Sequence, residues 1–174
     1  MIQMAEVIPA IIPKSFDDLL RKAVAVQGLV KTVQVDIMDG EFAPEPSYPF
    51  TTHDRSDLER NLSQELRLGI ELDMMVNDPE QYFGEWMQFG VSSFILHYGS
   101  TNKLEQLIDY LHVQQKSVGL AFTPSTPLHE LDPFVKKVDF LQHMGNDKIG
   151  FHGVELDESV YDRIRDLRSR YNNV

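Results

Sequence analysis

Short runs that alternate apolar and polar residues recur along the chain, and a segment with helical spacing follows each of them. The strand-like runs cover residues 6–12, 32–38, 69–76, 92–98, 117–123 and 138–144. Strands that alternate with helices of about 12 residues are typical of a parallel sheet built from strand-helix units. The pattern therefore predicts an α/β fold of about six such units, in a single domain over residues 1–174.

Capping residues and apolar spacing mark the helical segments. Ser15 with Asp18 three residues later resembles a capping box, and Asp78 and Thr126 each precede a proline, a common first residue of a helix. Asp157 stands before the last helical segment. Two apolar helix faces are predicted, Leu104, Leu107, Ile108 and Leu111 on one helix and Val160, Ile164, Leu167 and Tyr171 on the other.

The second strand-like run assigns the two faces of the predicted sheet. Successive side chains of a strand point to opposite faces, so the apolar residues Val33, Val35 and Ile37 are expected to face the helices. The same parity predicts interior side chains on five strands: Gln34, Asp36, Met38, Glu71, Asp73, Met75, His97, Thr123, Gln142 and Met144.

A polar interior at the carboxyl ends of the strands is where barrels of this kind place chemistry, whereas a purely structural interior is filled by Val, Ile and Leu. We therefore interpret the polar set as a candidate site. Two alternatives remain open: the polar groups only satisfy one another, or the register is shifted by one residue, which would reverse every face.

The segment after the second strand carries turn and loop signals. Asp39 and Gly40 predict a turn, because aspartate caps backbone N–H groups and glycine tolerates positive φ. Residues 41–53 contain Pro44, Pro46 and Pro49 and are interpreted as a loop that covers the strand ends or, alternatively, as a stiff connector.

Composition narrows the classes of partner. The 174 residues carry a formal net charge of -11 and no cysteine. The negative charge argues against nucleic acid and anionic membrane surfaces as partners, and the lack of cysteine excludes disulfides and thiolate-bound zinc. No apolar run approaches the roughly 20 residues of a membrane span. We expect a cytoplasmic protein without nucleic-acid or membrane partners.

Five segments in order resemble the ribulose-phosphate 3-epimerase family. DIMDGEF (residues 36–42) resembles the signature after that family's second strand, and residues 72–82, 94–100, 123–131 and 138–145 are similar to later strands and turns. The resemblance implies a TIM barrel, in which eight strand-helix units close into a ring. It also implies a reaction that inverts a ketose phosphate, such as a pentulose 5-phosphate, at the carbon beside the ketone.

The resemblance also implies roles for individual residues. Members use two aspartates from opposite strands as acid and base, with a divalent metal held by those aspartates and two histidines. Asp36 matches the first catalytic aspartate. Met38, Met75 and Met144 match pocket-lining methionines, and Gly150 and Gly153 match part of a phosphate-binding loop. With His97, which the parity places inside, these residues form the expected substrate site.

The departures from the family pattern fall at functional positions. Gln34 and Asp73 stand where the two metal-binding histidines are expected, and Ala10 and Pro13 replace two serines. The sequence ends at Val174, where the seventh strand with the second aspartate would begin. Asp36, Asp73 and His97, with Gln34 as a weak ligand, therefore remain as the candidate ligands for zinc, iron, manganese or magnesium.

Three interpretations follow from these matches and departures. The chain is an epimerase-type isomerase with an altered site, a non-catalytic relative that binds a sugar phosphate or a protein, or a fragment that another chain completes. A parallel sheet of six strands leaves two open edges, near residues 7–12 and 140–144. Since unpaired edges associate, we expect a homo-oligomer that forms through them.

Overall fold

A single parallel sheet organises the chain in the computed structural model, which describes residues 5–151 and 153–171. Within those residues the six strands pair strictly in chain order, β1-β2-β3-β4-β5-β6. Their bounds are Ala10–Ile11, Thr32–Met38, Gly69–Met75, Ser93–His97, Ser117–Phe122 and Phe140–His143. The predicted α/β repeat of strand-helix units is confirmed.

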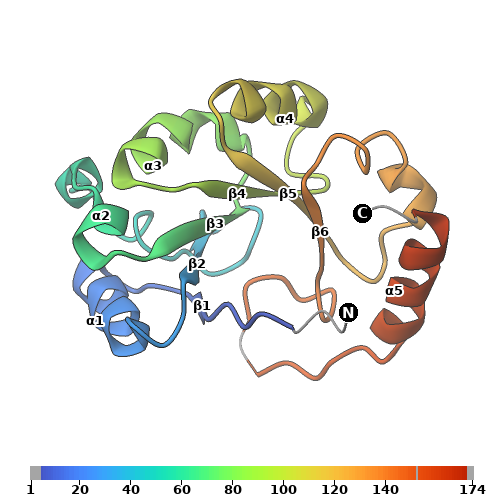
Figure 1. Cartoon of the computed structure of the whole chain (residues 1–174), viewed down its shortest axis with the longest axis horizontal. Coiled ribbons are helices and arrows are strands. Elements are labelled where there is room, and N and C mark those ends of the chain that lie inside the picture. Colours follow the sequence, from blue (N-terminus) through green and yellow to red (C-terminus); the bar gives the residue numbers. More distant parts are fainter. Residues whose placement is uncertain (1–4, 152, 172–174) are drawn as a thin grey trace.

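Helices cover the outer side of the curled sheet (Figure 1). The α-helices are α1 (Phe16–Val26), α2 (Leu62–Leu66), α3 (Phe83–Phe89), α4 (Leu104–Val113) and α5 (Ser159–Arg170). Short 3-10 helices occupy Ser56–Glu59 (η1), Pro79–Tyr82 (η2) and Leu128–Leu131 (η3). The arrangement is a partial barrel of the TIM type, with strands β1 and β6 at its two edges.

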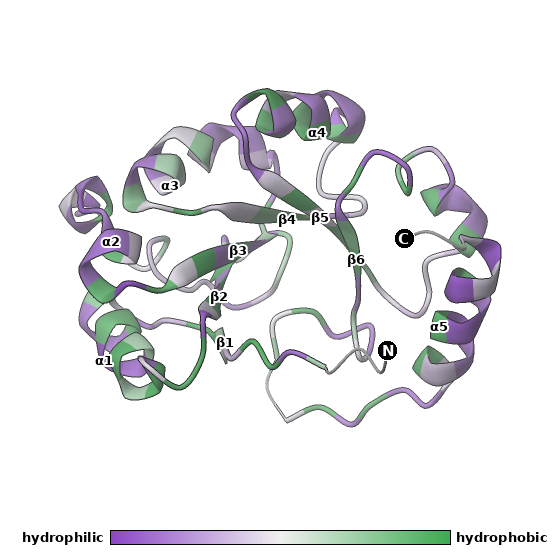
Figure 2. Ribbon diagram, in the orientation of Figure 1, coloured by the Kyte–Doolittle hydropathy of each residue, from purple (hydrophilic) through white to green (hydrophobic). Residues whose placement is uncertain are grey.

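The main apolar core lies between the sheet and its helices. Val33, Val35 and Ile37 of β2 are each at most 2% exposed and pack into this core, as the alternation predicts. The four predicted apolar residues of α4 are buried as well. In Figure 2, α1, α3 and α4 each carry both hydrophobic and hydrophilic strips, which is the pattern of helices packed on one side only.

Helix α1 begins at the predicted cap. The Ser15 hydroxyl accepts a hydrogen bond from the backbone N–H of Asp18 (3.2 Å), and the Asp18 carboxylate accepts one from the N–H of Lys14 (3.1 Å). This reciprocal pair satisfies two N–H groups that no helix carbonyl reaches.

Strand β1 and the helix after β5 differ most from the elements that their patterns suggested. Strand β1 covers only Ala10–Ile11 instead of residues 6–12, because Pro9 and Pro13 have no N–H to donate to a ladder. After β5, the helix expected behind Thr126 is only the 3-10 helix η3. Pro133 lies two residues beyond it, and the residue before a proline avoids the helical region.

The turn after β2 forms as predicted. The Asp39 carboxylate accepts the N–H groups of Glu41 and Phe42, each at 2.8 Å, and that of Asn77 at 2.7 Å. Gly40 has φ +85°, which a side chain would disfavour. The turn sends the following loop back across the ends of β2 and β3.

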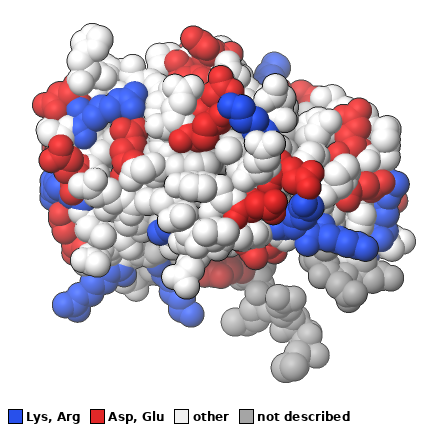
Figure 3. Space-filling view, turned by 90° about the horizontal axis from the view of Figure 1, so that it is seen from above, with Lys and Arg blue, Asp and Glu red and all other residues white. Residues whose placement is uncertain are grey.

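The described surface is mixed in charge. On the face shown in Figure 3, acidic and basic side chains are interspersed and no extended basic patch is visible. None of the described helices has the length and hydropathy needed to cross a bilayer.

Candidate functional site

A cluster of polar side chains lies on the concave face of the sheet. The register of β2 and β3 pairs Asp36 with Asp73, so the two carboxyl groups lie side by side. Gln34 donates from Nε2 to Asp36 Oδ1 (2.8 Å) and, at the longer distance of 3.4 Å, to Asp73 Oδ2. His97 Nε2 lies 2.6 Å from Asp73 Oδ1. The predicted parity of β2, β3 and β4 is therefore confirmed.

Gln142 connects the far side of the sheet to this cluster. Its Nε2 donates to Asp73 Oδ2 at 2.8 Å, although β4 and β5 lie between β3 and β6 in the sheet. Such a bond requires the sheet to curl until β3 and β6 face each other across the interior. Met144 joins the same group, because its sulfur lies 3.7 Å from Gln142 Nε2.

The cluster is buried. Asp73 and His97 are each 1% exposed, and Asp36 and Glu71 are each 8% exposed. Glu71 lies two residues before Asp73 on the same face of β3 and accepts a hydrogen bond from Ser93 Oγ (3.3 Å). Three carboxyl groups thus share a space with little water.

Burial and mutual repulsion shift the acidities of two of these carboxyls. Burial, followed by the nearby charge of Asp73, raises the pKa of Asp36 to about 8, and the hydrogen bond from Gln34 opposes the shift. Burial also raises the pKa of Glu71, with a further contribution from Asp73, while the Ser93 hydroxyl lowers it. Near neutral pH, Asp36 is therefore largely a neutral acid that holds a proton ready for exchange.

Methionines and a loop close the cluster at the carboxyl ends of the strands. Met38 and Met75 pack with Ala43 in a small core of their own, against which Ile12, Phe42 and Ile149 also pack. The ring of Phe42 lies edge-on to that of His97, with centroids 5.4 Å apart. The segment 41–53 thus covers the strand ends. Its interpretation as a covering loop is confirmed.

The two glycines of the expected phosphate loop differ in position. Gly150, at φ +86°, lies so close to Met38 that a Cβ there would be 2.6 Å from the Met38 sulfur. At Gly153 a Cβ would meet no described atom within 4 Å. The structure therefore brings Gly150 to the cluster and leaves Gly153 in open space.

Phe42 and Ser47 were not anticipated as neighbours of the candidate site. The Ser47 hydroxyl accepts the N–H of Met38 (3.0 Å) and donates to the carbonyl of Asp36 (3.2 Å). Both residues belong to a proline-rich loop whose path depends on long-range packing. The only signal in the sequence was the loop's position directly after Asp39 and Gly40.

The interior side chains that could ligate a metal ion are not arranged to bind one. A divalent metal needs free carboxylate oxygens or imidazole nitrogens. Asp73 Oδ2 already accepts N–H groups from Gln142 and Gln34, Asp73 Oδ1 lies 2.6 Å from His97 Nε2, and Gln34 also binds Asp36. Among residues 5–151 and 153–171 no three His, Cys, Asp or Glu side chains are grouped so as to hold a metal. In the described structure Asp36, Asp73 and Gln34 form a hydrogen-bonded group.

A cavity of about 330 Å³ adjoins the methionine end of the cluster. Met38 and Gly150 line it together with two basic residues, Lys14 and Lys22, and one acidic residue, Glu45. Lys22 also binds the carbonyl of Ile12 (2.9 Å) and the carboxylate of Asp18 (2.8 Å). Cationic side chains therefore lie next to the expected substrate residues.

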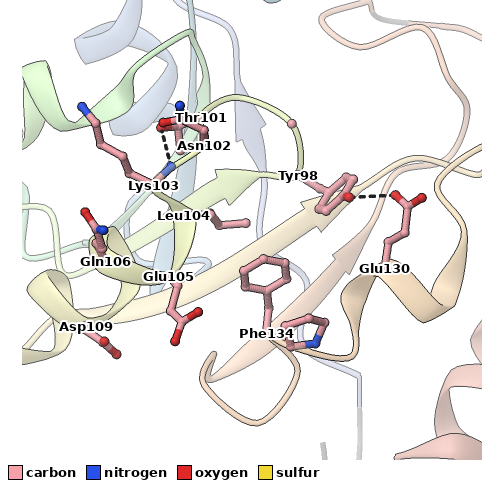
Figure 4. Close-up of a pocket in the computed structure, with 12 residues that line it drawn as sticks. Tyr98, Thr101, Asn102, Lys103, Leu104, Glu105, Gln106, Asp109, Glu130 and Phe134 are labelled. Atoms are coloured by element: carbon pink, nitrogen blue, oxygen red, sulfur yellow. Dashed lines mark hydrogen bonds between the residues drawn. The ribbon is translucent and has the colours of Figure 1, made fainter.

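A larger cavity, of about 760 Å³, lies on the outer side of the sheet between the start of α4 and η3. There the hydroxyl of Tyr98 donates to Glu130 at 2.7 Å (Figure 4). None of the residues expected from the sequence to form the site lines this cavity.

Comparisons with known proteins agree with the geometry. The model of the Ribulose-phosphate 3 epimerase family matches residues 6–174. The ribulose-phosphate 3-epimerase of Schizosaccharomyces pombe is 29% identical over 140 residues, which are 80% of this chain and 59% of that protein. That of Chlamydia muridarum is 22% identical over 136 residues, 78% of this chain and 57% of its own length. The chain thus spans less than two thirds of these curated relatives.

Proposed function

The chain belongs to the ribulose-phosphate 3-epimerase family, and we propose from this premise that its concave interior binds a ketose phosphate and that Asp36 exchanges the proton beside the ketone. One observation carries the proposal. The Asp36 carboxyl is buried on the concave face, and its pKa is raised to about 8. An acid-base group works best when its pKa lies near the pH of the reaction.

The chemistry needs a base and hydrogen-bond donors. Ionised Asp36 takes the proton from the carbon next to the carbonyl, and the electrons of the broken C–H bond form an enediolate. Amide N–H groups of Gln34 and Gln142 lie in the same cluster, where they bind the carboxyl groups of Asp36 and Asp73. Return of the proton from Asp36 restores the ketose.

The position of Asp73 limits the stereochemistry. Asp36 and Asp73 are paired on adjacent strands, so Asp73 lies beside Asp36 instead of across the substrate carbon. Asp36 removes and returns the proton on the same face of the substrate carbon. The described residues therefore exchange this hydrogen with solvent and retain the configuration of the carbon. Inversion requires an acid on the opposite face.

The cavity beside Met38 supports a phosphorylated ligand. Met38 follows Asp36 by two residues on the same face of β2, a separation of roughly 7 Å along a strand. Lys14 and Lys22 line the cavity at that end. A pentulose 5-phosphate with its reactive carbon at Asp36 places its phosphate near these two lysines.

Deuterium incorporation tests the proposal. A pentulose 5-phosphate is incubated with the protein in deuterium oxide, and proton NMR follows the signal of the carbon-bound hydrogen next to the ketone. The expected result is loss of this signal without appearance of the epimer. Asp36→Asn abolishes the exchange, while Asp166→Asn, an exposed aspartate of α5, leaves it unchanged. Equal exchange in Asp36→Asn and the unmodified protein contradicts the role of Asp36.

A second candidate function is non-catalytic binding of a sugar phosphate. It is favoured by the engagement of both Asp73 oxygens in hydrogen bonds within the cluster. In that case the ligand raises the melting temperature, by linkage between binding and stability, and no deuterium enters it. The same pair of measurements therefore separates the two candidates.

A further inference from the structure

The contacts of Asp36 and Asp73 indicate how two neighbouring carboxyl groups remain together in a buried space. Two carboxylates in such a site repel each other unless positive charge or hydrogen-bond donors lie between them. In this cluster the groups between and around them are the side-chain amides of Gln34 and Gln142 and the ring of His97.

Gln34 occupies the bridging position. Its Nε2 lies 2.8 Å from Asp36 Oδ1 and 3.4 Å from Asp73 Oδ2, so one amide group reaches both carboxyls. Asp36 Oδ1 and Asp73 Oδ2 both accept from this nitrogen, so the NH₂ end of the amide points inward. The amide therefore presents donors, not a metal-binding oxygen, to the carboxyls.

Gln142 and His97 make two further contacts with Asp73. Gln142 Nε2 donates to Oδ2 at 2.8 Å, and His97 Nε2 lies 2.6 Å from Oδ1. His97 is 1% exposed and the ring of Phe42 lies against it, so its ring is held in this position. A metal ion that bound Asp73 would have to displace at least one of these buried contacts, which is costly.

We propose that these side-chain amides, and not a divalent metal ion, hold the carboxyl groups of Asp36 and Asp73 together, so that the interior site works without a metal. Gln34 is the central residue of this arrangement and acts as a positioning residue. The inference concerns the residues of the proposed site, but it requires no turnover and its tests use no sugar.

Metal titration of the unmodified protein is the first test. Metal-stripped protein is titrated separately with Zn²⁺, Mn²⁺, Mg²⁺ and Fe²⁺, and binding is followed by calorimetry and by the melting temperature. A micromolar site at 100-fold excess of metal would raise the melting temperature by roughly 5–10 °C. We expect no saturable one-to-one binding that depends on Asp36. A one-to-one site that is lost in Asp36→Asn overturns the proposal.

Removal of the bridging amide is the second test. Gln34→Met keeps the length of the side chain and removes its N–H donors. The expected result is a fall in melting temperature of about 3–10 °C at neutral pH, because the hydrogen bonds of the amide to the two carboxyl groups are lost. Gln64→Met, a change of the same chemistry at an exposed position of α2, serves as the matched control with little effect.

The two tests together distinguish an amide from a metal as the bridging group. If Gln34→Met melts at the temperature of the unmodified protein, the amide does not hold the carboxyls and the proposal is wrong. Because neither test includes a ketose phosphate, a failure here is separate from a failure of the deuterium exchange experiment.

Discussion

The two faces of strand β2 are almost equally buried and yet hold very different side chains. On the convex face Val35 and Ile37 are 0% exposed and pack under the helices. On the concave face Asp36 is 8% exposed and binds Gln34 beside Asp73. Burial alone therefore does not decide what a position tolerates. The available hydrogen-bond partners decide whether a polar side chain is tolerated, because the concave face offers hydrogen-bond donors and the convex face offers only apolar atoms.

The largest expected effect comes from placing a carboxyl group on the convex face. Val35→Asp buries an acid among apolar side chains that cannot donate to it, and we expect a loss of about 4 kcal/mol or more of unfolding free energy. Circular dichroism during urea unfolding measures this loss. Val24→Asp, at a position of α1 that is 48% exposed, should cost no more than about 0.5 kcal/mol. Unchanged stability of Val35→Asp would remove the distinction between the faces.

The next largest effect concerns the charge of Asp36. Its pKa is raised to about 8 by burial and by Asp73, above the ordinary value of 3.8. Between these values the folded protein holds a proton that the unfolded chain has released, so this group makes stability fall as pH rises from about 4 to 8. Asp36→Asn removes that dependence.

The measurement for Asp36→Asn is urea unfolding at pH 5 and at pH 8.5. We expect the difference in unfolding free energy, variant minus unmodified protein, to increase by about 2–4 kcal/mol from pH 5 to pH 8.5. Asp166→Asn, on the exposed side of α5, provides the control without such a gain. A constant difference between Asp36→Asn and the unmodified protein over this range speaks against an ionisation of Asp36 near pH 8.

A smaller effect is expected where the loop after β6 meets the concave face. Gly150→Ala combines a positive φ of 86° with a Cβ 2.6 Å from the Met38 sulfur and 3.2 Å from the Ala43 Cβ. We expect a loss of about 1–2 kcal/mol, measured by thermal unfolding. Gly84→Ala is the matched control, since Gly84 lies in α3 with no atom within 4 Å of its Cβ position, and it should stabilise slightly. Equal effects of both changes would mean that Gly150 does not pack on Met38.

The smallest effect concerns Lys14 at the cavity beside Met38. Lys14→Met should weaken binding of a pentulose 5-phosphate by about 2–5-fold, the size expected for a single exposed ionic contact. Binding of the unphosphorylated pentulose should not change. Calorimetry measures both affinities, and Lys136→Met, an exposed lysine outside this cavity, serves as the control. An identical change for both sugars would place the phosphate elsewhere.

The alternation of β2 was sufficient to predict its two faces. Apolar Val33, Val35 and Ile37 belong on one side, and once parallel pairing is assumed, the same parity carries over to Asp73 and His97. The side-chain period is a local property of each strand, and the strands pair in chain order, as repeated strand-helix units commonly do. For that reason the sheet and the members of the polar cluster were predictable.

Other features depend on packing between distant segments and were not predictable. Phe42 reaches His97 only because the turn at Asp39 and Gly40 folds the loop back. Prolines changed the expected elements near their own positions: Pro9 and Pro13 restrict β1, and Pro133 follows the short η3. The bridging position of the Gln34 amide became visible only with its distances to Asp36 and Asp73.

The central claim is that the Asp36 carboxyl lies beside Asp73 in a buried polar interior and keeps its proton at neutral pH. Carbon-13 NMR of the side-chain carboxyl groups, with Asp36→Asn to assign the signal, follows its ionisation directly. We predict a titration step with a midpoint near pH 8 that disappears in the variant. A midpoint near the ordinary value of about 4 would contradict the account.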